Sequence, residues 1–197
     1  GATTGEARMG GAVGYVHETS TDVTGFNNYG KVTLEGGKAA GASVGGIVGK
    51  ITTYDSENTI SASKNFADVT ICHAIGNTHG GLGGILGLQL TTATKNETQK
   101  NEETGEDVTV AVPPTSATIT VTGCENSGKV ERNTAGSSNF HVGGVVGAFG
   151  GTDAVTVSAL TSCTNSGNVI NTSEAYAASH YSYTGGVIGY ARAGGEV

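Results

Sequence analysis

The residues best suited to binding chemistry lie near the C-terminal end of the chain. Four polar aromatic side chains occur close together there, namely Tyr176, His180, Tyr181 and Tyr183. Aromatic rings stack on apolar faces of a ligand such as a sugar, while phenol and imidazole groups hydrogen-bond at the ring edge. The cluster is therefore a candidate ligand-binding loop. The same side chains would also cover the end of the fold, and this structural role is the interpretation that we favour from the sequence.

The stretch between residues 91 and 117 is a second candidate, because it is the most acidic part of the chain. Its carboxylates are those of Glu97, Glu102, Glu103, Glu106 and Asp107. Carboxylate oxygens are ligands that Ca²⁺ prefers, but their spacing here differs from that of a calcium loop. We therefore expect a solvated acidic loop and no metal site.

The patterns of catalytic residues are missing from the sequence. A zinc peptidase needs two histidines one helical turn apart with a glutamate between them. His17 and Glu18 are followed by Thr21 where the second histidine would stand. Glycan-cleaving enzymes use paired carboxylates, whereas the acids outside the acidic stretch are scattered. We expect no catalytic residue and no cofactor, and hence a protein that is not an enzyme.

The composition excludes two classes of partner. Ten Lys and Arg against 17 Asp and Glu give a net charge of −7, which does not suit a nucleic-acid-binding surface built on Lys and Arg. No apolar run approaches the roughly 20 residues of a membrane-spanning helix, so we expect no membrane insertion by this segment. Val and Thr favour strands, while Gly and Asn favour turns. With 34 Gly in 197 residues, the chain is predicted to be all-β.

The elements that would position these side chains form an internal repeat, which is the first pattern to seek in such a sequence. A double glycine, two apolar residues and a third glycine occur five times, beginning at Gly10, Gly45, Gly83, Gly143 and Gly185. The best copies contain the glycines Gly45, Gly46 and Gly49, then Gly143, Gly144 and Gly147, and finally Gly185, Gly186 and Gly189. Glycine lets the backbone turn tightly or approach another segment closely.

A second signature, Cys-x-Asn-x-Gly-x-Val, follows the glycine motif at Cys124–Val130 and Cys163–Val169. Its asparagine recurs at four positions, Asn28, Asn65, Asn126 and Asn165. The distance from double glycine to asparagine is nearly constant, apart from one excess of about 20 residues that contains the acidic stretch. Asparagine suits a tight bend, and stacked asparagines hydrogen-bond to one another. We therefore predict an asparagine ladder.

A unit of about 40 residues with three short strands describes one coil of a β-solenoid. We predict one domain over residues 1–197: a single-stranded parallel β-solenoid of about five coils, right-handed by the parallel-crossover rule. The acidic stretch would be a loop extruded from one coil, with a hairpin near Asp107–Val112. Cys124 and Cys163 would lie one above the other with parallel side chains, which is poor geometry for a disulfide.

The two signatures together resemble the GLUG-motif repeats of bacterial surface proteins. These repeats occur in IgA-specific metallopeptidases of streptococci and in secreted proteins of gut Bacteroidetes. The best matches are Val44–Gly49, Gly143–Gly147 with Cys124–Val130, and Gly185–Gly189 with Cys163–Val169. The second unit departs from the pattern, with Ser63 for Cys and Ala67 for Gly. The resemblance implies a secreted or surface-attached β-solenoid that serves as a spacer or display module.

We accordingly expect a non-enzymatic bacterial module for adhesion, display or extracellular structure, located outside the cell or on its surface. Its partners would be a host or microbial glycan or protein, together with neighbouring repeats. Two alternatives stay open. One is a glycan-binding or polysaccharide-processing β-helix. The other is a self-assembling module, because the chain begins and stops inside the repeat without a visible polar cap.

Overall fold

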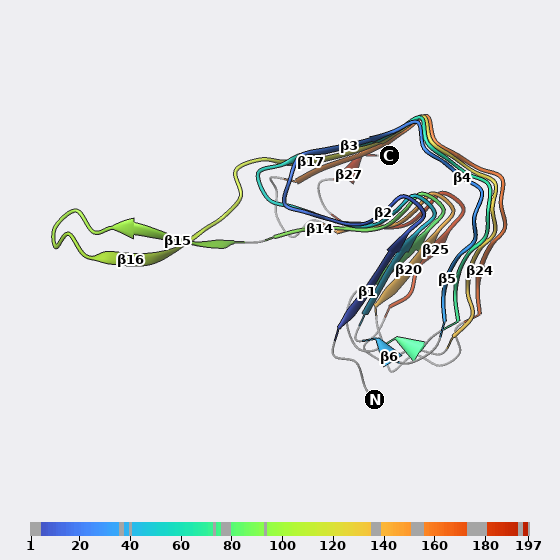
Figure 1. Cartoon of the computed structure of the whole chain (residues 1–197), viewed down its shortest axis with the longest axis horizontal. Helices are drawn as coiled ribbons and strands as arrows, with labels where there is room; N and C mark the ends of the chain where they lie inside the picture. Colours follow the sequence, from blue (N-terminus) through green and yellow to red (C-terminus); the bar gives the residue numbers. More distant parts are fainter. Residues whose placement is uncertain are drawn as a thin grey trace.

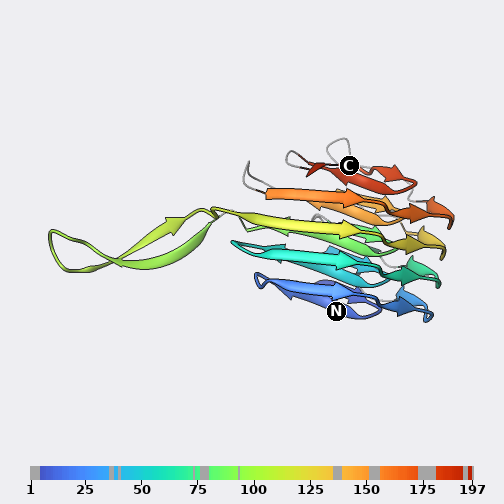
Figure 2. The ribbon, with the colours of Figure 1, turned by 90° about the horizontal axis from the view of Figure 1, so that it is seen from above.

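The chain folds into a parallel β-solenoid, which confirms the predicted fold class (Figure 1). A computed structural model describes residues 5–35, 38–39, 41–72, 74–75, 80–92, 94–134, 139–150, 156–172, 181–192 and 195–196. Within these ranges the regular elements are all strands. Successive coils stack one on another along the axis of the solenoid (Figure 2).

Each complete coil contains five strands in a fixed order. In the first coil they are β1 (Glu6–Gly10), β2 (Val13–His17), β3 (Thr21–Thr24), β4 (Asn27–Asn28) and β5 (Val32–Leu34). The second coil has β7 (Gly41–Gly45), β8 (Val48–Thr53), β9 (Glu57–Ser61), β10 (Lys64–Asn65) and β11 (Val69–Ile71). A short parallel pair, β6 (Lys38–Ala39) with β12 (Ala74–Ile75), lies beside these coils.

The same order recurs in the upper coils. The third has β13 (Gly80–Gly83), β14 (Leu86–Thr91), β17 (Ala117–Thr122), β18 (Glu125–Asn126) and β19 (Val130–Arg132). The fourth has β20 (Phe140–Gly143), β21 (Val146–Gly150), β22 (Thr156–Thr161), β23 (Thr164–Asn165) and β24 (Val169–Asn171). The described part of the last coil has β25 (Thr184–Gly185), β26 (Ile188–Ala191) and β27 (Gly195–Glu196). The repeat thus makes about four full turns and part of a fifth.

Strands at equivalent places pair in parallel, and the sequence repeat sets their register. The double glycines align from coil to coil, with Gly10 opposite Gly45 and Gly83 opposite Gly143. The prediction of three strands per coil was wrong. The glycine–aliphatic segment is two strands because the backbone bends after the first glycine, as at Gly46 and Ile47. The asparagine corner adds a further two-residue strand.

The three glycines of the motif are required by close approaches of backbone. A Cβ on Gly45 would lie 2.0 Å from the carbonyl oxygen of Val48, across the bend. A Cβ on Gly46 would lie 2.5 Å from Cγ of Asn65, and one on Gly49 would lie 2.5 Å from the carbonyl oxygen of Met9. The equivalent glycines of the fourth coil, Gly143, Gly144 and Gly147, meet the same kinds of neighbour. In the last coil Gly185 and Gly189 are equally crowded, whereas Gly186 has nothing within 4 Å.

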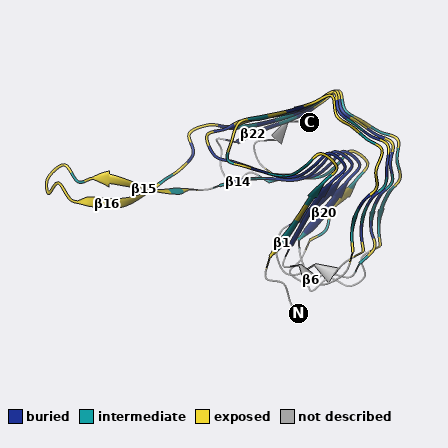
Figure 3. Ribbon diagram, viewed as in Figure 1, coloured by how far each residue is buried: buried dark blue, intermediate teal, exposed yellow. Residues whose placement is uncertain are grey.

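The apolar interior consists of two clusters of buried side chains, one with residues of β8 and β9 and the other with residues of β7 and β11. Figure 3 shows buried residues along the strands on both sides of the glycine bend. Ile47 and Val48 belong to the same cluster, although neighbouring residues of a straight strand point to opposite faces. The bend between the two strands explains this difference, because it turns both side chains toward the wall of the solenoid that contains β3 and β9. Ile85 with Leu86 and Val145 with Val146 repeat the pair in the next coils.

The asparagines form the ladder that the repeat predicts. The Nδ2 group of Asn28 donates to Oδ1 of Asn65 at 2.8 Å, Asn65 donates to Asn126 at 2.7 Å, and Asn126 donates to Asn165 at 2.7 Å. The same Nδ2 groups donate to the carbonyl two residues further along, for example Gly128 at 2.8 Å. Each inner carboxamide therefore fixes its own corner and joins it to the neighbouring coils.

The insertion in the third coil is an antiparallel hairpin of β15 (Lys95–Lys100) and β16 (Asp107–Val112). It projects sideways from the stack of coils (Figures 1 and 2). Its backbone pairing leaves most of its side chains exposed. A long excursion of this kind leaves the pairing of the coils intact, since β14 and β17 still align with their neighbours.

The described residues include no helix long and apolar enough to cross a membrane.

Candidate functional site

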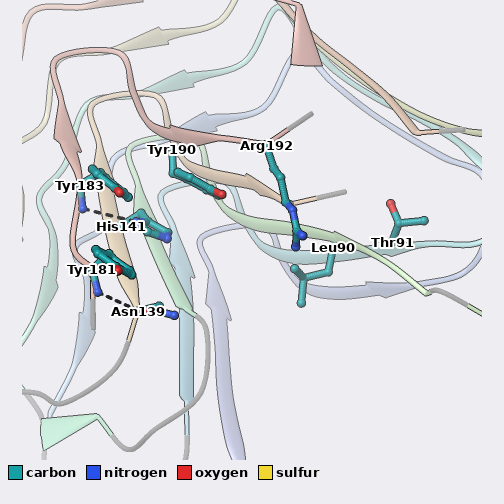
Figure 4. A pocket seen from close by; sticks show the side chains of 9 residues that line it. Leu90, Thr91, Asn139, His141, Tyr181, Tyr183, Tyr190 and Arg192 are labelled. Carbon is teal, nitrogen blue, oxygen red and sulfur yellow. Dashed lines mark hydrogen bonds between the residues drawn. The ribbon is translucent and has the colours of Figure 1, made fainter. Parts of the chain in front are cut away.

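A cavity of about 490 Å³ opens over the upper coils, between the strands that precede and follow the glycine bend (Figure 4). Its size lies within the range of about 300–1,000 Å³ that is typical of small-molecule sites. Its lining residues are Leu90, Thr91, Asn139, His141, Gly150, Tyr181, Tyr183, Tyr190 and Arg192. We call it the aromatic cavity, because four of these side chains carry rings.

Hydrogen bonds from the backbone of the last coil to side chains of the coil below position Tyr181 and Tyr183. The Tyr181 N–H donates to Oδ1 of Asn139 at 2.8 Å, and the Tyr183 N–H donates to Nδ1 of His141 at 3.3 Å. The two tyrosines are two residues apart in an extended segment, so their side chains share one face. The intervening Ser182 instead donates its hydroxyl to the carbonyl of Phe140 at 2.6 Å.

The four rings lie nearly parallel. His141 stacks with Tyr190 at a centroid distance of 4.5 Å and with Tyr183 at 5.4 Å. Tyr183 lies 5.6 Å from Tyr190 and 6.4 Å from Tyr181, with interplanar angles of 11° and 6°. His141 is only 5% exposed, whereas Tyr183 is 46% and Tyr181 60% exposed. A buried ring therefore supports outer rings that are open to a ligand.

The hydrogen bond at His141 fixes how the ring is protonated. Nδ1 accepts the Tyr183 N–H, so the neutral ring carries its proton on Nε2. Among the residues that the structure describes around the cavity, Arg192 is the one with a full positive charge, and none is Asp or Glu. Figure 4 shows its side chain across the cavity from Tyr181 and Tyr183, beside Tyr190 and Leu90. The cavity therefore combines stacking surfaces with one cation.

The structure brings only part of the predicted aromatic cluster to this cavity. Tyr181 and Tyr183 line it, while Tyr176 and His180 lie outside the described residues. Sequence reasoning missed His141, Tyr190 and Arg192. A signal for His141 was present, because it precedes its double glycine by two residues, as Tyr183 does. Stacking of equivalent positions places these two rings one above the other.

The acidic hairpin does not gather its carboxylates into a metal site. Asp107 pairs with Lys100 at 2.6 Å, and the Asn101 side chain caps the turn by accepting the Glu103 N–H at 2.9 Å. No group of three or more His, Cys, Asp or Glu side chains suited to a metal ion occurs in the described part of the chain. His73 and His79 lie outside it.

The stacked cysteines interact as free thiols. Cys124 and Cys163 are unbridged, and the Cys124 N–H donates to Sγ of Cys163 at 3.4 Å. Two coils lower, Oγ of Ser63 accepts the N–H of Phe26 in the same way. The hydrogen bond from Cys124 and nearby backbone N–H groups outweigh burial and lower the pKa of Cys163 to about 7. The partner thiol and burial raise the pKa of Cys124.

Comparison with protein-family models, with curated proteins and with solved structures finds no match for the chain.

Proposed function

We propose that the chain is a non-enzymatic module of a secreted or surface-attached bacterial protein, and that it serves adhesion by binding glycan in the aromatic cavity. The observation that carries the proposal is the set of four near-parallel rings at an open cavity. Rings that share one orientation offer flat apolar faces for the C–H-rich faces of sugars, with hydroxyls at their edges. The resemblance to GLUG-motif repeats supports an extracellular location.

The rigidity of the scaffold supports binding as the function. Tyr183 and His141 lie on neighbouring coils. The Tyr183 N–H donates to the His141 ring and the Tyr183 carbonyl accepts the Val142 N–H, so the two residues are placed before a ligand arrives. A preorganised site spends less free energy on ordering its side chains. The lining residues that the structure describes do not include the two carboxylates that most glycan hydrolysis needs, and this favours binding over cleavage.

A glycan array tests the proposal, run with and without calcium. The wild type is compared with Tyr183→Ala, and with Tyr29→Ala as a matched control. Tyr29 is 73% exposed and stacks on Phe66, away from the cavity. We expect specific retention of the wild type and of Tyr29→Ala, with at least a tenfold loss for Tyr183→Ala. No retention, or equal losses in the two variants, would refute glycan binding at this site.

Display of the hairpin is a second candidate function, favoured by how firmly its root is held. Lys95 pairs with Glu18 at 2.7 Å and lies 4.2 Å above the ring of Tyr54. The Tyr54 hydroxyl donates to the carbonyl of Val112 at 2.9 Å. These contacts fix the two strands of the hairpin to the first and second coils and hold its exposed side chains at a constant place.

Amide hydrogen exchange tests this anchoring. Tyr54→Phe removes only the hydroxyl, so a net hydrogen bond of about 1 kcal/mol is lost and exchange near the root should rise about fivefold. Exchange at the turn around Gly105 should stay unchanged and serves as the internal control. An unchanged rate at the root would show that Tyr54 does not anchor the hairpin.

A further inference from the structure

We infer that the aromatic cavity selects an acidic glycan, with a sugar carboxylate bound by Arg192 and a sugar ring stacked on Tyr183 and Tyr181. The inference rests on the proposed glycan-binding function and adds the class of sugar. It depends on the charge, the shape and the chemistry of the cavity.

The charge of the cavity is opposite to that of the chain. The net charge is −7, yet the described residues of the lining hold a single permanent charge, the guanidinium of Arg192. The ion pairs formed between described residues do not include Arg192. Its backbone N–H donates to the carbonyl of Phe149 at 3.1 Å, which anchors the residue at the cavity wall. An exposed arginine without a carboxylate among those residues is ready to accept one from a ligand.

The shape keeps the approach to Arg192 open. Ala191 pairs with Phe149, so Arg192 follows above Gly150, and Gly150 in turn lies above Leu90. A Cβ on Gly150 would lie 2.8 Å from Cδ2 of Leu90. The missing side chain of Gly150 therefore makes room for Leu90, which supplies an apolar floor to the cavity. The cation, the floor and the rings face one space (Figure 4).

The chemistry of this arrangement matches a sugar acid on two sides. A guanidinium binds a carboxylate through two parallel hydrogen bonds and is weakly hydrated, which suits a partly enclosed site. Aromatic rings bind the apolar face of a pyranose but do not distinguish acidic from neutral sugars. Arg192 is therefore the specificity residue, and the tyrosines supply affinity for both classes.

The test uses a panel of sialylated and uronate-containing oligosaccharides, each beside its carboxyl-reduced neutral form, together with sulfated oligosaccharides. The wild type is compared with Arg192→Gln, which removes the charge from an exposed side chain. Lys31→Gln, a matched control, removes one positive charge from an exposed residue outside the cavity lining. Melting temperatures within about 2 °C of the wild type establish that the variants are folded.

We expect the wild type to bind the carboxylated forms about ten- to a hundredfold more tightly than the reduced forms, because charge-assisted hydrogen bonds to arginine are strong. Arg192→Gln should lose this preference, and Lys31→Gln should keep it. Raising the salt concentration should weaken binding of the acidic forms only.

Three results would overturn the inference. They differ in whether they also refute the proposed glycan binding. Equal binding of acidic and reduced forms, still lost in Tyr183→Ala, would refute the acidic specificity and leave glycan binding in place. Tighter binding of sulfated sugars than of carboxylated ones would refute the carboxylate as the recognised group. Absence of binding to every glycan would refute both this inference and the proposed function.

Discussion

Removal of one rung of the asparagine ladder should destabilise the solenoid strongly, and Asn126 is the rung to remove. Its carboxamide is 1% exposed and takes part in three hydrogen bonds: with Asn65, with the carbonyl of Gly128, and with Asn165. Each is worth about 1 kcal/mol net, and buried partners left unpaired cost more. Asn126→Ala should therefore lower the free energy of unfolding by about 3–4 kcal/mol.

Urea denaturation followed by circular dichroism measures this change, and the melting temperature provides a second readout. A loss of about 3–4 kcal/mol corresponds to a fall of roughly 6–16 °C for a chain of this size. The slope of the free energy against urea concentration must stay the same in wild type and variant, so that the difference reports stability.

Two further substitutions calibrate the result. Asn28→Ala removes the lowest rung, which is half-buried and donates to Gly30 and Asn65 at 2.8 Å, so we expect about half the loss. Asn96→Ala removes an exposed asparagine of the hairpin and should cost less than about 0.5 kcal/mol. If Asn126→Ala and Asn96→Ala differ by less than about 1 kcal/mol, the ladder does not hold the coils together.

Three other predictions concern pH, thiol reactivity and the hairpin. Burial raises the pKa of Glu6, but its contacts with Lys50, Ser43 and Arg8 lower it more, so the net shift is downward from 4.5. Ionised Glu6 therefore makes its full contribution to the free energy of unfolding above pH 4.5, and this contribution is lost as the pH falls through the lowered pKa. Urea denaturation should show a smaller loss of stability on acidification in Glu6→Gln than in the wild type. The alkylation of Cys163 by iodoacetamide should have its midpoint near pH 7, and Cys124 should react only at higher pH. Mass spectrometry distinguishes the two modified cysteines. Equal rates for both would contradict the hydrogen bond between them. Replacement of residues 95–112 by a short Gly/Ser turn should preserve the strand signal in circular dichroism, because β15 and β16 form their strand ladder with each other and their contacts with the coils are side-chain contacts at the root. Loss of that signal would mean that the coils depend on the hairpin.

The repeat carried most of the information about the fold. Because Asn28, Asn65, Asn126 and Asn165 mark the same place in each coil, their spacing predicts both the parallel stacking and the register. The number of strands could not be derived in this way. The apolar pair Ile47 and Val48 reads as part of one strand, and only the three-dimensional close approach at Gly45 and Gly46 shows why the chain must bend there.

The candidate site was less accessible to sequence reasoning. Tyr181 and Tyr183 stand out because polar aromatic residues cluster around them. His141 is distant in sequence from the two tyrosines, and Arg192 lies outside the aromatic cluster. Each joins the site only through the strand register between neighbouring coils. Arg192 follows the last glycine motif and sits over Gly150, a position with no chemical signature of its own. The cavity forms between strands of different coils, so the sequence alone does not reveal it.

The central claim is that glycan binds at the aromatic cavity, and nuclear magnetic resonance of ring-labelled tyrosines tests it most directly. A glycan retained on the array is titrated into protein labelled with ¹³C at its tyrosines, with each resonance assigned by a Tyr→Phe substitution. We predict saturable shifts of the rings of Tyr181, Tyr183 and Tyr190, with Tyr29 and Tyr54 unchanged. Shifts at Tyr29, or saturable binding that leaves the three cavity rings unmoved, would contradict the account.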